Sequence, residues 1–443
     1  MANILFDIQP AKGHINATLK MAKLLKQAGH KVSYALPDNY WSDVQKHGFI
    51  GVSEVPVPHI KEASITLDSD NHSKYCRERN DDELADFRIN LKQKRPDLVL
   101  LDEQNSYKAI YYQIISFMVI FFMSKPDSGK TKGIPPFSYY FLPRQTALSH
   151  IYVEFLWLSR VLYTRTYLLL TNILSGNRAP YSVCRKISKK YGINFNKLLE
   201  CQRSFGYGVK GIPRLILSPS AFDFPHDEKP GVHRVGPLVD IFREGQIHNS
   251  RYETILLNIE ELRIRNKGKI IYASMGTVTR FDVKRCTRFF LRIVKVARMN
   301  PDDIFILSTG KNFDVSLLLP TPDNMMVFES LPQVDLLQKC DIMITHGGMN
   351  SITECVFCEV PVLVYPLSRH WDQPGNSARA VFHGLGLRGR IERDSAGTIS
   401  RKLNKLKKNY GMYKRNVIKM KERFEEQNNS LEVVHIIESY IKD

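Results

Sequence analysis

Residues 3–36 read NILFDIQPAKGHINATLKMAKLLKQAGHKVSYAL, and this stretch indicates the fold class. An apolar strand over residues 3–8 leads into a polar loop, and apolar residues then recur at helical spacing from Ile15 to Ala28. Gly29 ends the helix, and Lys31–Leu36 has the pattern of a second strand. A strand, a helix and a strand in this order are typical of a parallel α/β sheet.

The second half of the chain repeats this order of strands and helices. Its predicted strands are Lys269–Ser274, Ile304–Ser308, Asp341–Thr345 and Pro361–Tyr365. Its predicted helices include Asp282–Met299 and Gln373–His383. In the first half, a further strand at Asp97–Leu101 ends directly before Asp102. The chain is therefore expected to contain two α/β units.

Prolines mark the junction between the two units. Ser218–Asp240 contains four of them, which favours a linker. We predict an N-terminal domain over residues 1–236, a second domain over residues 237–420, and a C-terminal helix over residues 421–443 that packs back on the first domain. Ligands of open α/β sheets bind beyond the carboxyl ends of the strands, so two such sheets can share one cleft.

The composition is that of an ordinary globular protein. Of 443 residues, 43% are apolar and 24% are charged, which excludes a disordered chain. The net charge of +18 favours anionic partners, whether phosphate compounds, nucleic acid or acidic lipid. The first residues lack the pattern of a signal peptide, so we expect a cytoplasmic protein with reduced thiols.

Two long apolar stretches raise the question of membrane insertion. Ala109–Met123 is shorter than the ~20 residues that a bilayer span requires, and we expect a buried element there. Ile151–Ile173 is long enough, but it contains Glu154, Arg160 and Arg165, whose charges are costly in lipid. We expect a helix that lines a pocket or rests on a membrane surface.

The strongest local signal is HGGMNSITE at His346–Glu354, which follows a strand and opens a helix. Glycines let the backbone approach a ligand closely. The start of a helix offers free N–H groups and a partial positive charge, which suit a phosphate. A plain glycine turn with an Asn or Ser helix cap is the alternative interpretation.

His14, after Gly13, is a candidate general base. It stands at a predicted helix start, where the positive helix end disfavours the imidazolium form and keeps the ring able to accept a proton. A purely local hydrogen bond at the helix start is the alternative interpretation.

Several motifs occur in the order of a known donor signature. Pro332-Gln333 is followed by His-x-Gly-x-Asn-Ser-x-x-Glu at residues 346–354, and then by Asp372-Gln373 with Asn376. This order resembles glycosyltransferase family 1, which includes plant secondary-product, bacterial macrolide and animal glucuronosyl enzymes. The resemblance is strong over residues 274–387 and weaker elsewhere. It implies an α/β protein with two facing Rossmann-like domains and parallel sheets, the glycosyltransferase B fold.

The resemblance implies a role for each matching residue on the donor side. Gln333 and the backbone around Leu331 would lie near the uracil of a UDP-sugar, and Glu354 would bind the ribose hydroxyls. Asp372 and Gln373 would bind the hydroxyls of the sugar, with glucose favoured. The diphosphate would be held by Ser274, Thr277, His346, Gly348, Asn350 and Ser351.

The resemblance also implies an inverting mechanism. His14 would take the proton of an acceptor hydroxyl, and Asp102 would orient the imidazole. The hydroxyl oxygen would displace the diphosphate in one step, and no metal or other cofactor is required. The acceptor would be a small hydrophobic hydroxylated compound, since the N-terminal half is rich in aromatic residues between Tyr139 and Tyr163. These aromatic residues equally suit a plain core.

The sequence departs from the family pattern at three places. Ser330 stands where the family often has a tryptophan that stacks on uracil, and Glu359 stands where glycine is usual. The segment between Pro366 and Asp372 is longer than in plant members and contains Trp371. These departures bear on recognition of the base and of the sugar.

Two other functions remain open on this pattern. One is a nucleotide-sugar epimerase on the same fold, and the other is a non-catalytic nucleotide-sugar-binding protein. Basic residues around Arg401–Arg423 suit either peripheral contact with the inner face of a membrane or a solvated helix face. No nucleic-acid-binding motif accompanies the positive charge, so nucleic acid is not an expected partner.

Overall fold

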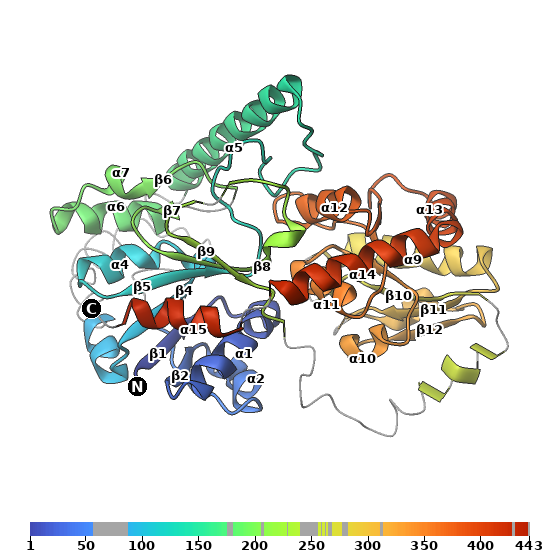
Figure 1. Cartoon of the computed structure of the whole chain (residues 1–443), viewed down its shortest axis with the longest axis horizontal. Helices are drawn as coiled ribbons and strands as arrows, with labels where there is room; N and C mark the ends of the chain where they lie inside the picture. The colour runs from blue at the N-terminus through green and yellow to red at the C-terminus, as the bar shows by residue number, and fades with distance from the viewer. Residues whose placement is uncertain are drawn as a thin grey trace.

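The computed structural model describes residues 1–55, 87–174, 180–204, 208–227, 229–239, 268–276, 282–310, 313–427 and 430–441, with a few positions between 256 and 264. Within these residues the chain forms two parallel sheets that lie side by side and are flanked by helices (Figure 1). The predicted α/β class with two parallel sheets is confirmed.

The first sheet has the strand order β3-β2-β1-β4-β5-β8-β9. Its strands are β1 (Asn3–Asp7), β2 (Lys31–Ala35), β3 (Ile50–Val52), β4 (Leu98–Asp102), β5 (Val119–Met123), β8 (Arg214–Pro219) and β9 (Val232–Gly236). A small antiparallel pair, β6 (Leu199–Glu200) and β7 (Gly208–Val209), lies apart from it. The helices of this half are α1 (Lys12–Gln27), α2 (Trp41–Gln45), α4 (Lys108–Ile114), α5 (Ala147–Leu174), α6 (Pro180–Lys190) and α7 (Phe195–Leu198).

The second sheet has the strand order β12-β11-β10-β13-β14-β15. Its strands are β10 (Ile270–Ser274), β11 (Ile304–Ser308), β12 (Met325–Phe328), β13 (Ile342–Thr345), β14 (Val362–Val364) and β15 (Gly386–Arg388). Its helices are α9 (Val283–Met299), α10 (Gln333–Leu337), α11 (Met349–Phe357), α12 (Gln373–Phe382), α13 (Ala396–Lys408) and α14 (Tyr410–Glu426). The chain ends in α15 (Ser430–Ser439).

Both faces of each sheet are buried, which explains the unbroken apolar runs of the strands. In β1, Ile4 and Phe6 pack into one apolar cluster, whereas Leu5 packs into a second cluster on the opposite face. In β10, Ile271 and Tyr272 divide in the same way between two clusters. Alternate side chains of a strand point to opposite faces, so each sheet needs helices on both sides.

The stretch predicted as a linker, Ser218–Asp240, contains parts of two strands. Residues 214–219 form β8 and residues 232–236 form β9, and both strands belong to the first sheet. The prolines do not interrupt these strands, because Pro219 is the last residue of β8 and Pro237 follows β9. Proline is tolerated at such strand ends because no internal ladder hydrogen bond is lost there.

The chain returns to the first half at its C-terminus. Val433, Val434 and Ile437 of α15 are buried in the cluster that also contains apolar residues of α1. At the edge of this contact, His30 Nε2 lies 3.2 Å from an oxygen of Glu438. The predicted domain limits at residues 236 and 420 themselves stay predictions.

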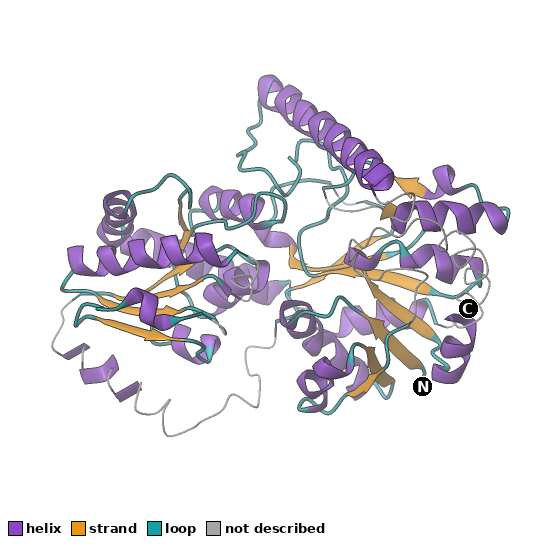
Figure 2. Ribbon diagram, turned by 180° about the vertical axis from the view of Figure 1, so that it is seen from behind, coloured by secondary structure: helices purple, strands orange, loops and turns teal. Residues whose placement is uncertain are grey.

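Helix α5 lies at the edge of the N-terminal half and extends away from the sheet, as Figure 2 shows from behind. Across the described residues, the structure has no helix with both the length and the apolar character that crossing a bilayer requires. The apolar run at residues 109–123 divides between α4 and β5 and is largely buried, as predicted.

Candidate active site

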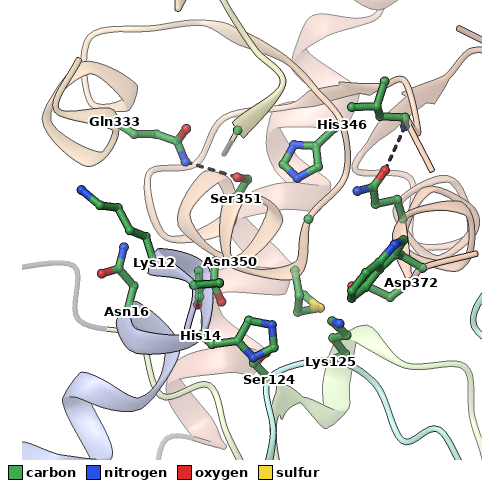
Figure 3. A pocket seen from close by; sticks show the side chains of 18 of the residues that line it. Lys12, His14, Asn16, Ser124, Lys125, Gln333, His346, Asn350, Ser351 and Asp372 are labelled. Carbon is green, nitrogen blue, oxygen red and sulfur yellow. Dashed lines mark hydrogen bonds between the residues drawn. The ribbon is translucent and has the colours of Figure 1, made fainter. Parts of the chain in front are cut away.

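A pocket of about 920 Å³ lies between the two halves of the molecule. The first half lines it with residues 9–14, which follow β1, and the second half with residues 348–351 and 367–373. These segments follow the carboxyl ends of β1, β13 and β14, where parallel α/β sheets bind ligands. Figure 3 shows side chains of both halves converging on this space.

His14 lines the pocket and forms a close pair with the buried Asp102. His14 lies in the first turn of α1, Asp102 is the last residue of β4, and His14 Nδ1 is 2.6 Å from Asp102 Oδ2. Burial tends to raise the pKa of Asp102, but His14 and the backbone N–H of Gln104 outweigh it, so this pKa is lowered. Because Asp102 is then a carboxylate, His14 donates from Nδ1, and its Nε2 is an acceptor.

Gln104 occupies the acceptor nitrogen of His14. Its side-chain Nε2 lies 2.9 Å from His14 Nε2 and donates a hydrogen bond to it. An incoming hydroxyl must therefore displace the Gln104 amide before it can bind His14. Sequence analysis missed Gln104, because no motif marks it; its position two residues after Asp102, at the end of a strand, was the available signal.

The start of α11 faces the pocket with open backbone groups. Gly348 is the N-cap residue, and the N–H groups of the first helical turn have no partner within the helix. A Cβ atom on Gly348 would lie 2.6 Å from His346 Nε2, and one on Gly347, which has φ +85°, would lie 2.6 Å from Val364 Cγ1. Both glycines are therefore required for this approach of the loop to the pocket.

His346 is buried behind this helix start and lines the pocket. Burial lowers the pKa of His346 to about 4 against the opposing effect of Asp372, so the ring is neutral at pH 7. Its Nδ1 has no hydrogen-bond partner within the described part of the chain. A buried nitrogen of this kind is costly unless a ligand or water pairs with it.

Gln333, Ser351 and Glu354 form a second polar group on the wall. Gln333 Nε2 donates to Glu354 Oε2 at 2.6 Å and lies 3.3 Å from Ser351 Oγ. Leu331 lines the pocket beside them. Gln333 and Glu354, both predicted to bind the nucleoside, therefore lie together although they are 21 residues apart in the chain.

A hydrogen bond joins the two halves across the pocket. Asn350 Nδ2, at the start of α11, donates to the backbone oxygen of Gly13 at 2.9 Å. It brings the predicted diphosphate site next to the loop that carries His14.

Comparisons with known proteins agree with this geometry. Residues 294–440 match the model of the erythromycin biosynthesis protein CIII-like C-terminal domain. The NDP-glycosyltransferase YjiC of Bacillus subtilis is 23% identical over 384 residues, which cover 85% of this chain and 82% of that protein. The zeaxanthin glucosyltransferase of Pantoea ananas is 31% identical over 170 residues, or 38% of this chain and 35% of that protein.

The C-terminal third of the chain therefore matches a glycosyltransferase domain model, and most of the chain is similar to family 1 glycosyltransferases.

Solved structures of similar proteins share the whole architecture. The glycotransferase of kitacinnamycin superposes with a TM-score of 0.67 at 18% identity and covers 99% of both chains. The glycosyltransferase VinC, solved in complex with DTDP, superposes with a TM-score of 0.62 at 16% identity and also covers 99% of both chains. The chain therefore has the glycosyltransferase B fold, as predicted.

The residues predicted to bind the sugar are tied into the protein. Gln373 Oε1 accepts hydrogen bonds from the N–H groups of Leu367 and Ser368 at 2.8 and 2.9 Å. Asp372 Oδ2 accepts from Asn376 Nδ2 at 2.6 Å. Both Asp372 and Gln373 line the pocket. The side-chain oxygen of Gln373, however, is already hydrogen-bonded to the backbone of the loop at Leu367 and Ser368.

Two further residues line the pocket near Asp372, and only one of them, Trp371, was singled out in the sequence. Lys125 Nζ lies 4.2 Å from the centre of the Trp371 ring, and both residues line the pocket. Burial lowers the pKa of Lys125, and the nearby Asp372 and Asp102 oppose this effect. Trp371 was identified as a departure from the family, whereas Lys125 carried no sequence signal, since it follows β5 as a single cation in a mixed loop.

Among the predicted diphosphate ligands, Ser274 does not line the pocket. Ser274 is the last residue of β10, is buried, and accepts a hydrogen bond from the N–H of Gly276 at 3.2 Å. Gly276, not Ser274, lines the pocket. Thr277 lies outside the described residues.

Glu359, the residue in place of the usual family glycine, adopts φ +58°. This conformation favours glycine. The side chain compensates through ion pairs with Lys421 at 2.8 Å and Lys414 at 3.2 Å, which also lower the pKa of Glu359. This departure lies at the end of α11 and leaves its first turn unchanged.

Proposed function

We propose that the protein is an inverting glycosyltransferase that moves a hexose, with glucose favoured, from a UDP-sugar to a hydroxyl of a small lipophilic acceptor. One observation carries the proposal. His14, which pairs with Asp102, and the open start of α11 line the same pocket, one from each half. The first suits proton removal and the second suits a diphosphate.

The proposed reaction is a single displacement. His14 Nε2 takes the proton of the acceptor hydroxyl once the hydroxyl has replaced the Gln104 amide. The acceptor oxygen forms a bond to the anomeric carbon while the bond from that carbon to the diphosphate oxygen breaks. The diphosphate leaves with its negative charge at the N–H groups of α11, and Asp102 stabilises the imidazolium. An α-linked donor then gives a β-glycoside.

Support for UDP over dTDP comes from the chemistry of Glu354. A carboxylate can accept hydrogen bonds from both hydroxyls of a ribose, whereas a 2′-deoxyribose offers only one. In the proposed pose the Glu354 carboxylate accepts hydrogen bonds from both the Gln333 amide and the ribose hydroxyls. VinC, the solved family relative that binds DTDP, makes the thymidine nucleotide the natural competitor.

We expect UDP to raise the melting temperature of the protein more than dTDP does at equal concentration. Binding to the folded state alone stabilises it by about 2.7 kcal/mol at 100-fold excess over Kd. Differential scanning fluorimetry measures both shifts. Glu354→Gln is expected to narrow the difference between the two shifts. Glu425→Gln, at an exposed carboxylate on α14 away from the pocket, is the control. Equal shifts with UDP and dTDP in the native protein would contradict the assignment of Glu354.

The test of the reaction is a mass-spectrometric screen of UDP-glucose with mixed phenols and lipophilic alcohols. A glycosylated product in the screen supports transfer. A changed sugar nucleotide when UDP-glucose is incubated alone would indicate an epimerase instead, and nucleotide binding with neither product would indicate a binding protein.

Asp102→Asn is expected to lower kcat about 100-fold with little change in the KM for the donor. An asparagine can donate to His14 Nδ1, which places the proton of the neutral ring on Nε2 and removes the base. Steady-state kinetics at saturating acceptor measure the effect, and Asp38→Asn, an exposed carboxylate, is the control. An unchanged kcat would show that Asp102 does not set the tautomer of His14.

A further inference from the structure

Helix α5 exposes an unusually apolar face. Of the 28 large apolar or aromatic side chains that are exposed in the described part of the chain, twelve belong to this one helix. They include Ile151, Phe155, Leu158, Leu162, Leu169 and Ile173. They are three or four residues apart, except for Leu162 and Leu169, which are two helical turns apart, so all six lie on one face of the helix.

Helix α5 packs into the protein mainly through its first half. All of its buried residues lie between Ser149 and Trp157, and the Trp157 indole N–H donates to the backbone oxygen of Ile134 at 2.7 Å. From Leu158 to Leu174 the described side chains include none that is buried. The six exposed apolar side chains therefore lie on the face of α5 opposite to its buried residues.

The surroundings of α5 are strongly basic. Residues 125–203 contain thirteen Lys and Arg residues against three Asp and Glu residues, which is more than half of the net charge of the chain. The adjacent helix α6, which contacts α5, exposes Arg185, Lys186, Lys189 and Lys190. An apolar stripe bordered by cations is the pattern of a helix that lies in the surface of an anionic bilayer.

We propose that α5 is a membrane-surface helix, which lies in the headgroup region of an anionic lipid bilayer without crossing it. Arg165 is exposed on the same face, between Leu162 and Leu169, and its long side chain can reach lipid phosphates. A second copy of the chain is the weaker partner, because it would bring two basic surfaces together. This surface is distinct from the basic residues around Arg401–Arg423.

The pocket lies beside the proposed membrane surface. The ring of Tyr163 in α5 stacks on His370 with centres 6.0 Å apart, and His370 lines the pocket. A docked α5 would therefore hold this side of the pocket close to the lipid. The membrane-binding proposal itself does not depend on the reaction that the pocket performs.

The test is vesicle flotation with the full-length protein. We expect binding to vesicles of phosphatidylcholine mixed with phosphatidylglycerol, weaker binding to phosphatidylcholine alone, and weaker binding at high salt. Leu158→Glu with Leu162→Glu is expected to weaken binding at least about tenfold, because two side chains must leave the apolar phase. Both leucines are more than half exposed, so the fold should tolerate the change.

The matched control is Leu317→Glu with Met412→Glu. These residues are also exposed, lie in the other half, and add the same two negative charges. Retained binding by the control and lost binding by the α5 variant would support the proposal. Absence of binding by the native protein, or equal loss in both variants, would overturn it. A third result would also overturn the proposal. In this case light scattering would show that the native protein is a dimer, and the α5 variant, but not the control, would be a monomer with unchanged vesicle binding.

Discussion

Replacing His14 with alanine is expected to lower glycosyl transfer by about 10³-fold while nucleotide binding is retained. The nitrogen that would take the acceptor proton is lost, and no other described side chain forms a comparable pair with Asp102. Donor binding should persist, because the start of α11 and the group formed by Gln333 and Glu354 belong to the other half.

Two measurements on the same protein samples check this expectation. Product formation gives the rate, and isothermal titration with UDP gives the affinity of the donor site. His435→Ala, which removes an exposed imidazole on α15, controls for loss of a histidine in general. Full transfer by the His14 variant would exclude His14 as the base, whereas loss of UDP binding would mean that His14 also supports the donor site.

Arg379→Met is expected to reduce the free energy of unfolding by about 3–5 kcal/mol. Arg379, in α12 of the second half, contacts Asp223 Oδ1 through Nε at 2.8 Å and Nη2 at 2.7 Å. Asp223 lies between β8 and β9 of the first half, and both side chains are buried. Removal of the arginine leaves a buried carboxylate with only Arg234, at 3.5 Å, as an ion-pair partner.

The loss of unfolding free energy in Arg379→Met should become smaller at low pH. Burial would raise the pKa of Asp223, but Arg379, His226 and Arg234 outweigh it and lower this pKa. The ion pair therefore stabilises the fold above the ordinary aspartate pKa, and this contribution disappears as the pH falls through the lowered value. The difference between wild type and variant is expected to shrink below about pH 4.

Denaturant unfolding at several pH values measures this difference. Arg415→Met, at an exposed site on α14, should change the free energy of unfolding by less than about 1 kcal/mol. Asp223→Asn combined with Arg379→Met should recover part of the loss, because no buried charge then remains unpaired. A loss below about 1 kcal/mol in Arg379→Met would show that this contact does not hold the two halves together.

The strands of the two sheets could be predicted where the chain is apolar without interruption. β11 lies at the predicted residues 304–308, and β4 is shifted by only one residue from its predicted place. The strands β8 and β9 were missed because prolines at their ends look the same in a sequence as prolines in a linker. A strand end is paired with a neighbouring strand and a linker is not, and the sequence does not show this pairing.

The candidate site could be predicted where a family motif marks it. Gln333, His346, Asn350 and Glu354 were found in this way, and the structure brings them to one pocket. Gln104 and Lys125 were missed because their importance comes from neighbours that are distant in the chain. The length and the charged residues of the stretch at 151–173 led to the prediction of a helix, but they could not tell whether its apolar face is covered or exposed.

The path of the chain limits how the two halves can move. The backbone passes between them twice, once between β9 and β10 and again between α14 and α15, which packs on α1. A body attached at two points can rotate about the line through them, but it cannot slide freely. Release of product is then expected to proceed as a hinge rotation that parts Asn350 from Gly13 and reopens the catalytic crevice, with both attachment points serving as its axis.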